Sequence, residues 1–479
     1  MKTFSRRQFI RSTAAASAAF PLVTISGTKS SGQVIGANDR IRIAIAGLGT
    51  RGKMTHLKEY SAMSGVEIAY LVDPDTTRID ECTEILSAAG ASKPRSVQDV
   101  RHALDDDDVD VLSIATPNHW HSLMAIWACQ AGKDVYIEKP LSHNLVEGRK
   151  VVEAARRYNR IVQHGTQKRS EPRSINVISA LQSGKYGKLL ISAGRCYKPR
   201  KSIGVKPPMQ PPENLDFNLW LGPTREQPYH ENLVHYNWHW FWDTGNGDLG
   251  NQGVHEVDVA RWAIKDAAFP QRVWSLGGRF AFDDQGQTPN VQLNVFEYGD
   301  VLLVFEVRNT CSKYDCSNQF ITDEGRITDD GVFHPNGGGS PEPIASVADQ
   351  PSPQDARHFA NFIAAVKQRN SELLNCPAEA GHFSAGICHL ANISYRLGSE
   401  SRFDERANAL GDNKFVLETF EGLQEHLRGD LKLPVDGTPY RVGRTLEFDA
   451  KAERFVNDQE ADAMLACDYR PPFVVPNQV

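Results

Sequence analysis

The chain has 479 residues, of which 40% are hydrophobic and 23% charged; this is an ordinary globular composition, in a chain too long for one compact core. Residues 1–37 carry five basic side chains and no acidic one, so the formal net charge of −6 leaves −11 for residues 38–479. This balance argues against nucleic acid or an anionic membrane as a partner, and no apolar run is long enough to span a bilayer.

The first 37 residues have the pattern of an export signal. Arg6 and Arg7 lie in a charged stretch, and a weakly apolar, alanine-rich stretch at residues 12–25 follows it. This arrangement resembles a bacterial twin-arginine signal, which implies a periplasmic or otherwise exported protein. The alternative is a disordered basic tail. We exclude residues 1–37 from the predicted fold.

Metal-binding patterns are weak in this chain. The eight cysteines include no CxxC pair and no Cys/His cluster with zinc spacing, so buried free thiols are expected. The acidic run at residues 105–108 lacks the pattern of a calcium loop and is predicted to be a solvated turn before a strand. We therefore predict no metal site.

A glycine-rich turn follows the first predicted strand, at residues 41–46. Gly47, Gly49 and Gly52 have the spacing G-x-G-x-x-G, and a helical stretch comes next. In this motif the first glycine allows the tight turn, the second lets a pyrophosphate approach the backbone, and the third lets the helix pack on the strand. The sequence therefore predicts a dinucleotide site.

The second predicted strand ends at Asp73, which lies 26 residues after Gly47. At that spacing an acidic residue binds the adenosine ribose hydroxyls, and its charge repels a 2′-phosphate. This favours NAD; Arg78 nearby keeps NADP as an alternative. Asp73 can also be read as a turn residue before Pro74.

Polar side chains also follow the next two predicted strands. The strand at residues 109–115 leads to Thr116, Pro117, Asn118, His119 and His121, and the stretch DVYIEKP places Glu138, Lys139 and Pro140 at another strand end. Strands and helices alternate, which predicts a doubly wound parallel sheet over residues 38–165. Ligands bind at the carboxyl edge of such a sheet.

The second half is predicted to be a separate α/β domain, residues 166–479. Residues 190–215 are rich in proline and lysine and predict a long loop that covers the site. Tyr236, Trp238, Trp240 and Trp242 alternate, which predicts a strand whose aromatic face either stacks on a sugar or packs in the core. Residues 291–307 are strand-like, residues 354–397 are helix-like, and residues 400–479 have no assigned role.

Four stretches together resemble the glucose–fructose oxidoreductase/inositol dehydrogenase (Gfo/Idh/MocA) family: GLGTRG at residues 47–52, ATPNH at 115–119, EKP at 138–140 and GNGDLGNQGVHEVDVARW at 245–262. The resemblance covers residues 40–400. It implies a Rossmann domain followed by an α/β domain with a large, open, mainly antiparallel sheet. It also implies NAD and a carbohydrate or polyol substrate. Such a sheet leaves a broad face exposed, which predicts a homo-oligomer.

The resemblance also implies roles for single residues. Lys139 matches the lysine beside nicotinamide and substrate, where it moves the proton of the reacting hydroxyl. Glu138 is expected to hold the nicotinamide ribose or to orient Lys139, and Gln167 to hold the nicotinamide or the substrate. The other residues predicted to bind the cofactor are Gly47, Gly49, Thr50, Arg51, Gly52, Asp73, Thr116, Pro117, Asn118 and His121. The alternative for Lys139 is a surface ion pair with Glu138.

One position departs from the family pattern. Many relatives have an aspartate four residues before the histidine that matches His255, and this chain has Asn251 there. Because an amide takes no proton, acid–base chemistry is predicted to rest on Lys139 and His255, with Asn251, Tyr236 and Trp240 binding substrate. His255 as a buried structural histidine remains the alternative, and Asp258 is expected to be structural.

Three functions are therefore considered. The first is an NAD(P)-dependent oxidoreductase that acts on a hydroxyl-bearing carbon of a sugar, glycoside or polyol. The second is a redox-neutral enzyme that cleaves or isomerises glycosides with a tightly bound NAD. The third is a sugar-binding protein without catalytic activity, against which the intact Lys139 and glycines speak.

Overall fold

The computed structural model describes residues 40–345, 357–403 and 408–479. The predicted export signal and the start of the predicted helical stretch at residues 354–356 lie outside these ranges. Within them, no helix is long and apolar enough to cross a membrane.

The N-terminal part is built on a six-stranded parallel sheet in the order β3-β2-β1-β4-β5-β6. Its strands are β1 (Ile41–Ala46), β2 (Val66–Val72), β3 (Arg95–Val97), β4 (Val111–Ile114), β5 (Asp134–Ile137) and β6 (Val162–His164). The central strands are short apolar runs buried on both faces, as a sheet covered by helices on both sides requires. The doubly wound sheet predicted from the sequence is confirmed.

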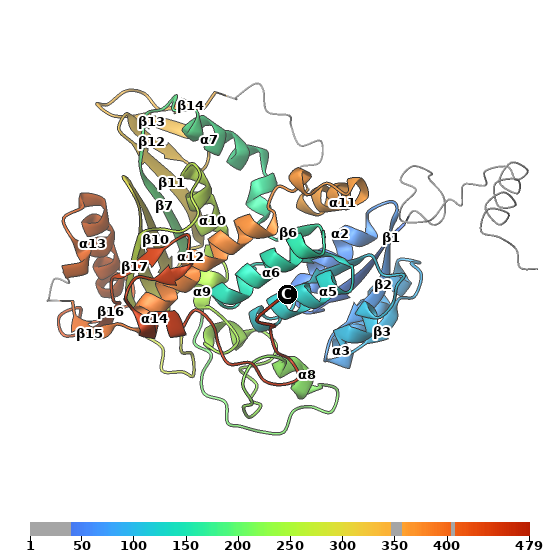
Figure 1. The fold of residues 1–479 in the computed structure, drawn as a ribbon. Helices are drawn as coiled ribbons and strands as arrows, with labels where there is room; N and C mark the ends of the chain where they lie inside the picture. The colour runs from blue at the N-terminus through green and yellow to red at the C-terminus, as the bar shows by residue number, and fades with distance from the viewer. Residues whose placement is uncertain (1–39, 346–356, 404–407) are drawn as a thin grey trace, which may run out of the picture.

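Helices connect these strands and cover the sheet (Figure 1). They are α2 (Lys58–Ser61), α3 (Thr76–Ala88), α4 (Val100–Leu104), α5 (Asn118–Gln130) and α6 (Leu145–Arg157), and a π-helical turn at Gly52–Leu57 precedes α2. The strand order reverses between β1 and β4, which places a crevice at their carboxyl ends.

The second sheet is larger and mixed. Its main path is β14-β13-β12-β11-β7-β10-β9-β8-β16-β15, with β17 paired to β8 and β18 to β17. Its strands are β7 (Leu189–Tyr197), β8 (Arg272–Gly278), β9 (Val291–Tyr298), β10 (Val301–Arg308), β11 (Asp315–Thr322), β12 (Gly325–Thr328), β13 (Val332–Pro335), β14 (Glu342–Pro343), β15 (Ser399–Arg402), β16 (Pro439–Val442), β17 (Leu446–Asp449) and β18 (Arg454–Phe455). Its neighbouring strands run antiparallel except for β7 and β10, so the predicted mainly antiparallel sheet is confirmed within the described residues.

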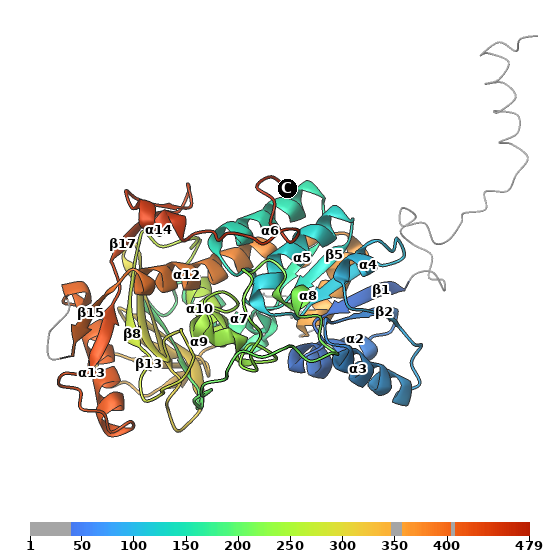
Figure 2. The same ribbon diagram turned by 90° about the horizontal axis from the view of Figure 1, so that it is seen from below.

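Helices lie on both faces of this sheet (Figures 1 and 2). One face packs against α10 and α12, and α13 covers part of the other face through Val416, Phe420 and Leu423. The helices of this part are α7 (Pro172–Gln182), α8 (Phe217–Leu221), α9 (Gly247–Gly250), α10 (Gly253–Ala263), α11 (His358–Gln368), α12 (Ala378–Arg396), α13 (Lys414–Gly429) and α14 (Gln459–Ala463).

The C-terminal residues, to which the sequence assigned no role, have a structural one. They add β16, β17 and β18 to the second sheet and then run back over the first domain beside α5 and α6 (Figure 2). There Phe473, Val475 and Val479 are buried in the same apolar cluster as Trp120 and Val151. Burial of these side chains ties the end of the chain to the Rossmann domain.

Two local predictions are wrong. Residues 190–197 belong to β7 rather than to a loop, because all the prolines of the stretch lie after residue 197. Residues 235–242 form no strand; Asn237–Trp240 is a 3₁₀ turn in which Trp238 and Trp240 are both buried while Tyr236 is 48% exposed. The strand was predicted from the alternation of aromatic residues. That pattern is not specific to strands, because large aromatic side chains also pack in the core from irregular segments.

Candidate active site

A cavity of about 700 Å³ lies between the two domains, at the carboxyl edge of the parallel sheet. The first domain contributes residues that follow β1, β2, β4 and β5, and the second contributes segments around residues 198, 219–220, 235–239 and 251–255. The predicted site residues that line it are Gly47, Gly49, Thr50, Arg51, Asp73, Thr116, Pro117, Asn118, His121, Glu138, Lys139, Tyr236, Asn251 and His255. The fold therefore brings two distant parts of the sequence to one cavity.

The glycine-rich turn closes one end of the cavity. Gly47 has a φ of 87°, and a Cβ atom there would lie 2.5 Å from the carbonyl carbon of Ala115. A Cβ on Gly52 would lie 1.9 Å from the carbonyl oxygen of Gly47, so this glycine permits the close packing of helix on strand. Gly49 has open space where a side chain would be, which is the room that a pyrophosphate needs.

Asp73 lies at the end of β2 and lines the same cavity. Its two carboxylate oxygens accept hydrogen bonds from the backbone N–H groups of Leu48 (2.7 Å) and Asp75 (2.9 Å). Burial raises the pKa of Asp73 to about 6. Each oxygen keeps a further lone pair for a ribose hydroxyl, so these residues fit the adenosine end of NAD. The buried Thr116 hydroxyl has no hydrogen-bond partner among the described residues, which leaves it for a bound group.

Glu138 organises the middle of the cavity. It is 3% exposed, and its Oε1 accepts hydrogen bonds from Arg51 Nε (2.7 Å), His56 Nε2 (3.2 Å) and Gln167 Nε2 (3.4 Å). Burial opposes its ionisation, but the Arg51 guanidinium holds the pKa of Glu138 well below its usual range. Glu138 is thus paired with Arg51 rather than with the side chain of Lys139. Gln167 does not line the cavity but acts on it through Glu138.

Lys139 points its ammonium group across the cavity to the second domain. Its Nζ donates hydrogen bonds to the backbone oxygen of Asn251 (2.9 Å) and to Asn251 Oδ1 (3.0 Å). Burial lowers the pKa of Lys139 to about 8, although the charge of Glu138 acts to raise it. At this pKa an appreciable fraction of the amine is neutral near pH 8, so Lys139 can both accept and donate a proton.

Asn251 places a neutral amide, rather than a carboxylate, against Lys139, which is consistent with the lowered pKa of this lysine. Asn251 Nδ2 donates to Asp248 Oδ1 at 3.0 Å, and Arg200 binds both Asp248 oxygens at 2.8 Å. The negative charge nearest to Asn251 is therefore already neutralised by a guanidinium. Arg200 and Asp248 complete a chain of hydrogen bonds that ends at Lys139.

We expect the substitution Asn251→Asp to raise the pKa of Lys139 from about 8 toward its ordinary value of about 10.4, because a carboxylate would stabilise the ammonium group at hydrogen-bond distance. The rate at which an amine-reactive reagent modifies Lys139, followed by mass spectrometry across pH, reports this value directly. Asn251→Ala is the control, because it removes the side-chain contact with Lys139, keeps the backbone contact and adds no charge. Equal pH midpoints for the two variants would contradict the expectation.

His255 lies on the same wall of the cavity, in the first turn of α10. Its ring has no hydrogen-bond partner in the part of the chain that the structure describes. Burial, assisted by the charge of Lys139, holds the pKa of His255 well below its usual range. The imidazole is therefore neutral, and a ring nitrogen can accept a hydrogen bond from a bound group. The helix is interrupted between α9 and α10, so Asn251 and His255 face the cavity from two segments rather than from one helical turn.

Two further predicted residues lie apart from the cavity wall. Trp240 is buried beneath Arg200, whose guanidinium lies 5.1 Å from the ring centroid, so its position supports core packing rather than direct contact with substrate. Asp258 is completely buried and pairs with Arg169 (2.7 Å) and Ser384 (2.5 Å), which is the structural role expected for it. His121 lines the cavity, and its ring nitrogens lie 2.6 Å from the carbonyl oxygen of Pro140 and 2.9 Å from that of Thr116.

Sequence reasoning missed several polar side chains of this site. The cavity is also lined by Lys198, Gln252 and His239. Outside the cavity wall, His56 is hydrogen-bonded to Glu138 and Arg200 to Asp248. None belongs to a motif with a fixed spacing from Lys139. Lys198 and Arg200 lay in the stretch that was predicted to be a loop over the site, and the richness of that stretch in lysine was their only signal.

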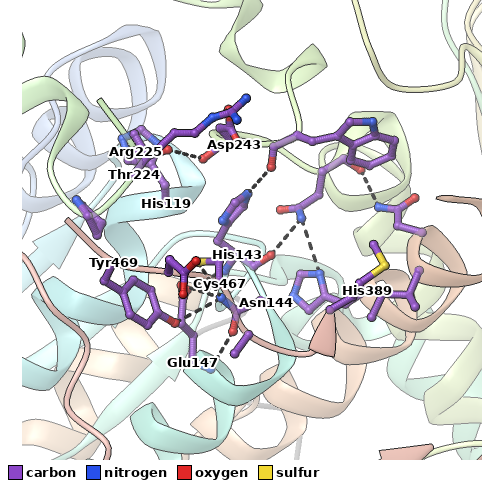
Figure 3. Close-up of a pocket in the computed structure, with 18 of the residues that line it drawn as sticks. His119, His143, Asn144, Glu147, Thr224, Arg225, Asp243, His389, Cys467 and Tyr469 are labelled. Atoms are coloured by element: carbon purple, nitrogen blue, oxygen red, sulfur yellow. Dashed lines mark hydrogen bonds and ion pairs between the residues drawn. The ribbon is translucent and has the colours of Figure 1, made fainter. Parts of the chain in front are cut away.

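A second cavity, of about 510 Å³, opens near the start of α6 (Figure 3). Potential ligand atoms of His143, Glu147 and Cys467 lie there within 4.8 Å of one another. Asn144 caps α6 by accepting from the Glu147 N–H at 3.0 Å, and the Glu147 carboxylate accepts from the N–H of His143 at 3.0 Å. Both groups therefore serve the N-terminal, positive end of a helix, an arrangement that disfavours a metal cation.

The comparison with known proteins identifies both domains. Residues 41–166 match the model described as "Oxidoreductase family, NAD-binding Rossmann fold", and residues 201–421 match "Oxidoreductase family, C-terminal alpha/beta domain". The first model is named GFO_IDH_MocA and the second GFO_IDH_MocA_C2. The NAD-binding domain predicted from the sequence is therefore confirmed.

Curated relatives match over part of their length. A "Glycosyl hydrolase family 109 protein" of Shewanella pealeana is 30% identical over 179 residues, which is 36% of this chain and 38% of the relative. One from Saccharopolyspora erythraea is 27% identical over 267 residues, 51% of this chain and 52% of the relative. The chain thus matches about two fifths to one half of the length of these relatives.

Solved structures share the fold at low identity. WlbA dehydrogenase from Bordetella pertussis, in complex with NADH and UDP-GlcNAcA, has a TM-score of 0.55 and 18% identity, and the match covers 74% of this chain and 97% of that one. Levoglucosan dehydrogenase, in complex with NADH and levoglucosan, has a TM-score of 0.55 and 17% identity, with 73% and 95% covered. These likenesses show the fold alone.

Proposed function

Because this chain belongs to the Gfo/Idh/MocA oxidoreductase family, we propose that it transfers a hydride between NAD and a hydroxyl-bearing carbon of a sugar, glycoside or polyol. The observation that carries the proposal is Lys139, whose Nζ bridges the two domains inside the cavity and whose pKa is lowered to about 8 by burial. Such a lysine is suited to take the proton of a hydroxyl group.

Several side chains of the cavity would hold the cofactor. The open space at Gly49, the carboxylate of Asp73 and the Thr116 hydroxyl fit its phosphate and ribose groups. Glu138 with Arg51 and Gln167 lies between these groups and Lys139. When bound, NAD supplies the hydride acceptor.

Side chains of the protein transfer the proton of the substrate hydroxyl group. Lys139 Nζ accepts the proton of the substrate hydroxyl and returns it in the reverse direction. Asn251 keeps the amine in place through two hydrogen bonds. Glu138, pinned by Arg51 and His56, fixes the backbone that carries Lys139 and accepts a hydrogen bond from the Lys139 N–H at 3.2 Å. A neutral His255 provides a second proton acceptor in the same cavity.

A second candidate is redox-neutral cleavage or isomerisation of a glycoside, in which NAD stays bound and is unchanged overall. The glycosyl hydrolase family 109 relatives favour it. This reaction needs one base for the hydroxyl proton and another for a C–H proton beside the oxidised carbon. Lys139 and His255 are two such groups on one cavity.

The test begins with protein purified without added cofactor. Released nucleotide is assayed after denaturation, and the native protein is then given a panel of sugars, glycosides and polyols while absorbance at ~340 nm, the NADH band, is followed. Bound NAD with lasting reduction supports the oxidoreductase. Bound NAD with product but no lasting absorbance change supports the redox-neutral enzyme. No bound nucleotide, and none taken up when offered, would refute both and leave a sugar-binding protein.

We also propose export by the twin-arginine route and a homo-oligomeric state. The paired Arg6 and Arg7 before a weakly apolar stretch support the first, and the broad second sheet supports the second. Cell fractionation of the chain and of its Arg6→Lys/Arg7→Lys variant tests export, since the variant should stay in the cytoplasm. Light scattering of the purified protein tests the oligomer, and a monomeric mass would contradict it.

A further inference from the structure

The carboxylates around the substrate end of the cavity are each paired with a cation of their own. Asp248 is held by Arg200 at 2.8 Å, and Glu256 pairs with Lys168 at 3.2 Å. Glu138 pairs with Arg51 at 2.7 Å. Each pair is formally neutral, although the charge of Asp248 also acts on Lys139 and Lys198.

Two lysines of the cavity wall have no such partner among the described residues. Lys139 donates to the oxygens of Asn251, which are neutral. Lys198 Nζ lies 3.1 Å from the amide oxygen Oε1 of Gln252 and 5.5 Å from the ring centroid of Tyr314, and both of these groups are neutral as well. The substrate end of the cavity therefore carries an excess of positive charge.

The two lysine ammonium groups lie close to each other in the cavity. Lys139 binds the backbone and side-chain oxygens of Asn251, and Lys198 binds the side-chain oxygen of Gln252, the next residue of the same turn. The Cα atoms of these two residues are about 3.8 Å apart, and both lysines line the same cavity. Lys198 follows the end of β7 and is half-buried, with its side chain on the wall of the cavity. Both groups therefore lie within the reach of a single sugar ring.

We propose, resting on the proposed function, that the substrate is an acidic sugar whose carboxylate binds Lys198 while a hydroxyl of the same ring meets Lys139. A hexuronic acid or its glycoside has this chemistry. A neutral sugar would leave the half-buried Lys198 ammonium without a counter-charge, whereas a carboxylate forms a charge-assisted hydrogen bond to it. The carboxylate is bound and not transformed.

The test uses pairs of probes that differ at one carbon. The dissociation constants of 4-nitrophenyl β-glucuronide and 4-nitrophenyl β-glucoside are measured by calorimetry on the full-length protein loaded with NADH, which accepts no hydride from them. The galacturonide and galactoside form a second pair. We expect at least one acid to bind about tenfold more tightly than its neutral partner, as a charge-assisted contact implies. The preference should shrink at high salt.

Variants of Lys198 test whether this residue causes the preference for the acidic probes. Lys198→Gln should bring the ratio of the two dissociation constants close to one, while Lys198→Arg should retain it. Lys201→Gln, which removes the same charge from an exposed position outside the cavity wall, is the matched control and should retain the ratio. A thermal melt of each variant shows that it is folded.

Three outcomes would overturn the inference. They are equal binding of acid and neutral probes, an unchanged ratio in Lys198→Gln, and loss of the ratio in Lys201→Gln. A glucoside 6-sulfate in place of the glucuronide distinguishes a sulfate site, and stronger binding of the sulfate would reject the carboxylate. Because binding is read without turnover, the acid preference can hold when no NADH forms, and NADH can form from neutral sugars when the preference fails.

Discussion

Replacement of Lys139 by alanine is expected to lower kcat/KM by about 10²–10⁴-fold, the range in which a positioned general base contributes, while the bound nucleotide is retained. Among the described residues, the Lys139 side chain reaches the second domain through its two hydrogen bonds to Asn251, whereas Asp73 lies toward the cofactor end. Steady-state kinetics with the best substrate and the nucleotide content per chain are the measurements.

Lys139→Arg is the control for charge. A guanidinium keeps the positive charge but does not deprotonate in proteins, so this variant should be nearly as inactive as alanine. The pH profile of the wild-type enzyme should show kcat/KM rising as pH increases through about 8, the pKa to which burial lowers Lys139. An active Lys139→Arg enzyme would contradict the assignment of Lys139 as the base.

Substitution of Asp258 by alanine is expected to lower the free energy of unfolding by about 3–5 kcal/mol, the usual effect of removing one partner from a buried ion pair. Asp258 has 0% exposure and Arg169 has 9%, and three hydrogen bonds of 2.7–3.0 Å join them. The variant would leave the Arg169 guanidinium buried without its counter-charge. Urea denaturation followed by tryptophan fluorescence measures the loss.

Two control variants show whether the loss of stability comes from the buried ion pair. Asp258→Ala/Arg169→Met should be less destabilised than Asp258→Ala alone, because it removes the closer of the two buried guanidinium groups that Asp258 neutralises; Arg261, at 3.9 Å, remains. Glu297→Ala, which breaks a surface pair with Arg272, should change stability little. If Asp258→Ala unfolds at the same urea concentration as the wild type, the pair is not a source of stability.

The same pair predicts a dependence of stability on pH. Burial acts to raise the pKa of Asp258, but the Arg169 charge dominates and lowers it to about 2, below the unfolded value of about 3.9. A depressed folded pKa contributes stability that is present above the unfolded value and is lost as pH falls from about 4 toward 2.

The parallel sheet was predictable because its signals are local. A short apolar strand, glycines at fixed spacing and an acid at the end of the next strand all follow from the geometry of one β-α-β unit. Gly47 and Gly52 have no room for a Cβ, and Asp73 binds the turn, so residue identity is tied to backbone position. Lys139 could be placed at the crevice for the same reason, because every parallel strand delivers its following residues to one edge.

The second half was less predictable. The alternating aromatic residues at 236–242 predicted a strand, yet this segment is held by packing of Trp238 and Trp240 in the interior. Residues 190–215 were predicted to be one loop because the stretch contains several prolines. These prolines all lie after residue 197, and the apolar residues before them form β7. Side-chain packing decided the first and strand pairing the second, and both are long-range interactions that no window of sequence contains.

The sequence by itself determined the Rossmann domain, the preference for NAD and the set of residues that follow its strands, because local backbone geometry demands particular residue types there. Only the tertiary structure decided which charges meet. It pairs Glu138 with Arg51, Asp248 with Arg200 and Asp258 with Arg169, across separations of 48–89 residues. It leaves Lys139 against a neutral Asn251, and it brings Lys198 to the same cavity. Electrostatic interactions depend on distance and burial, and these exist only once the chain is folded.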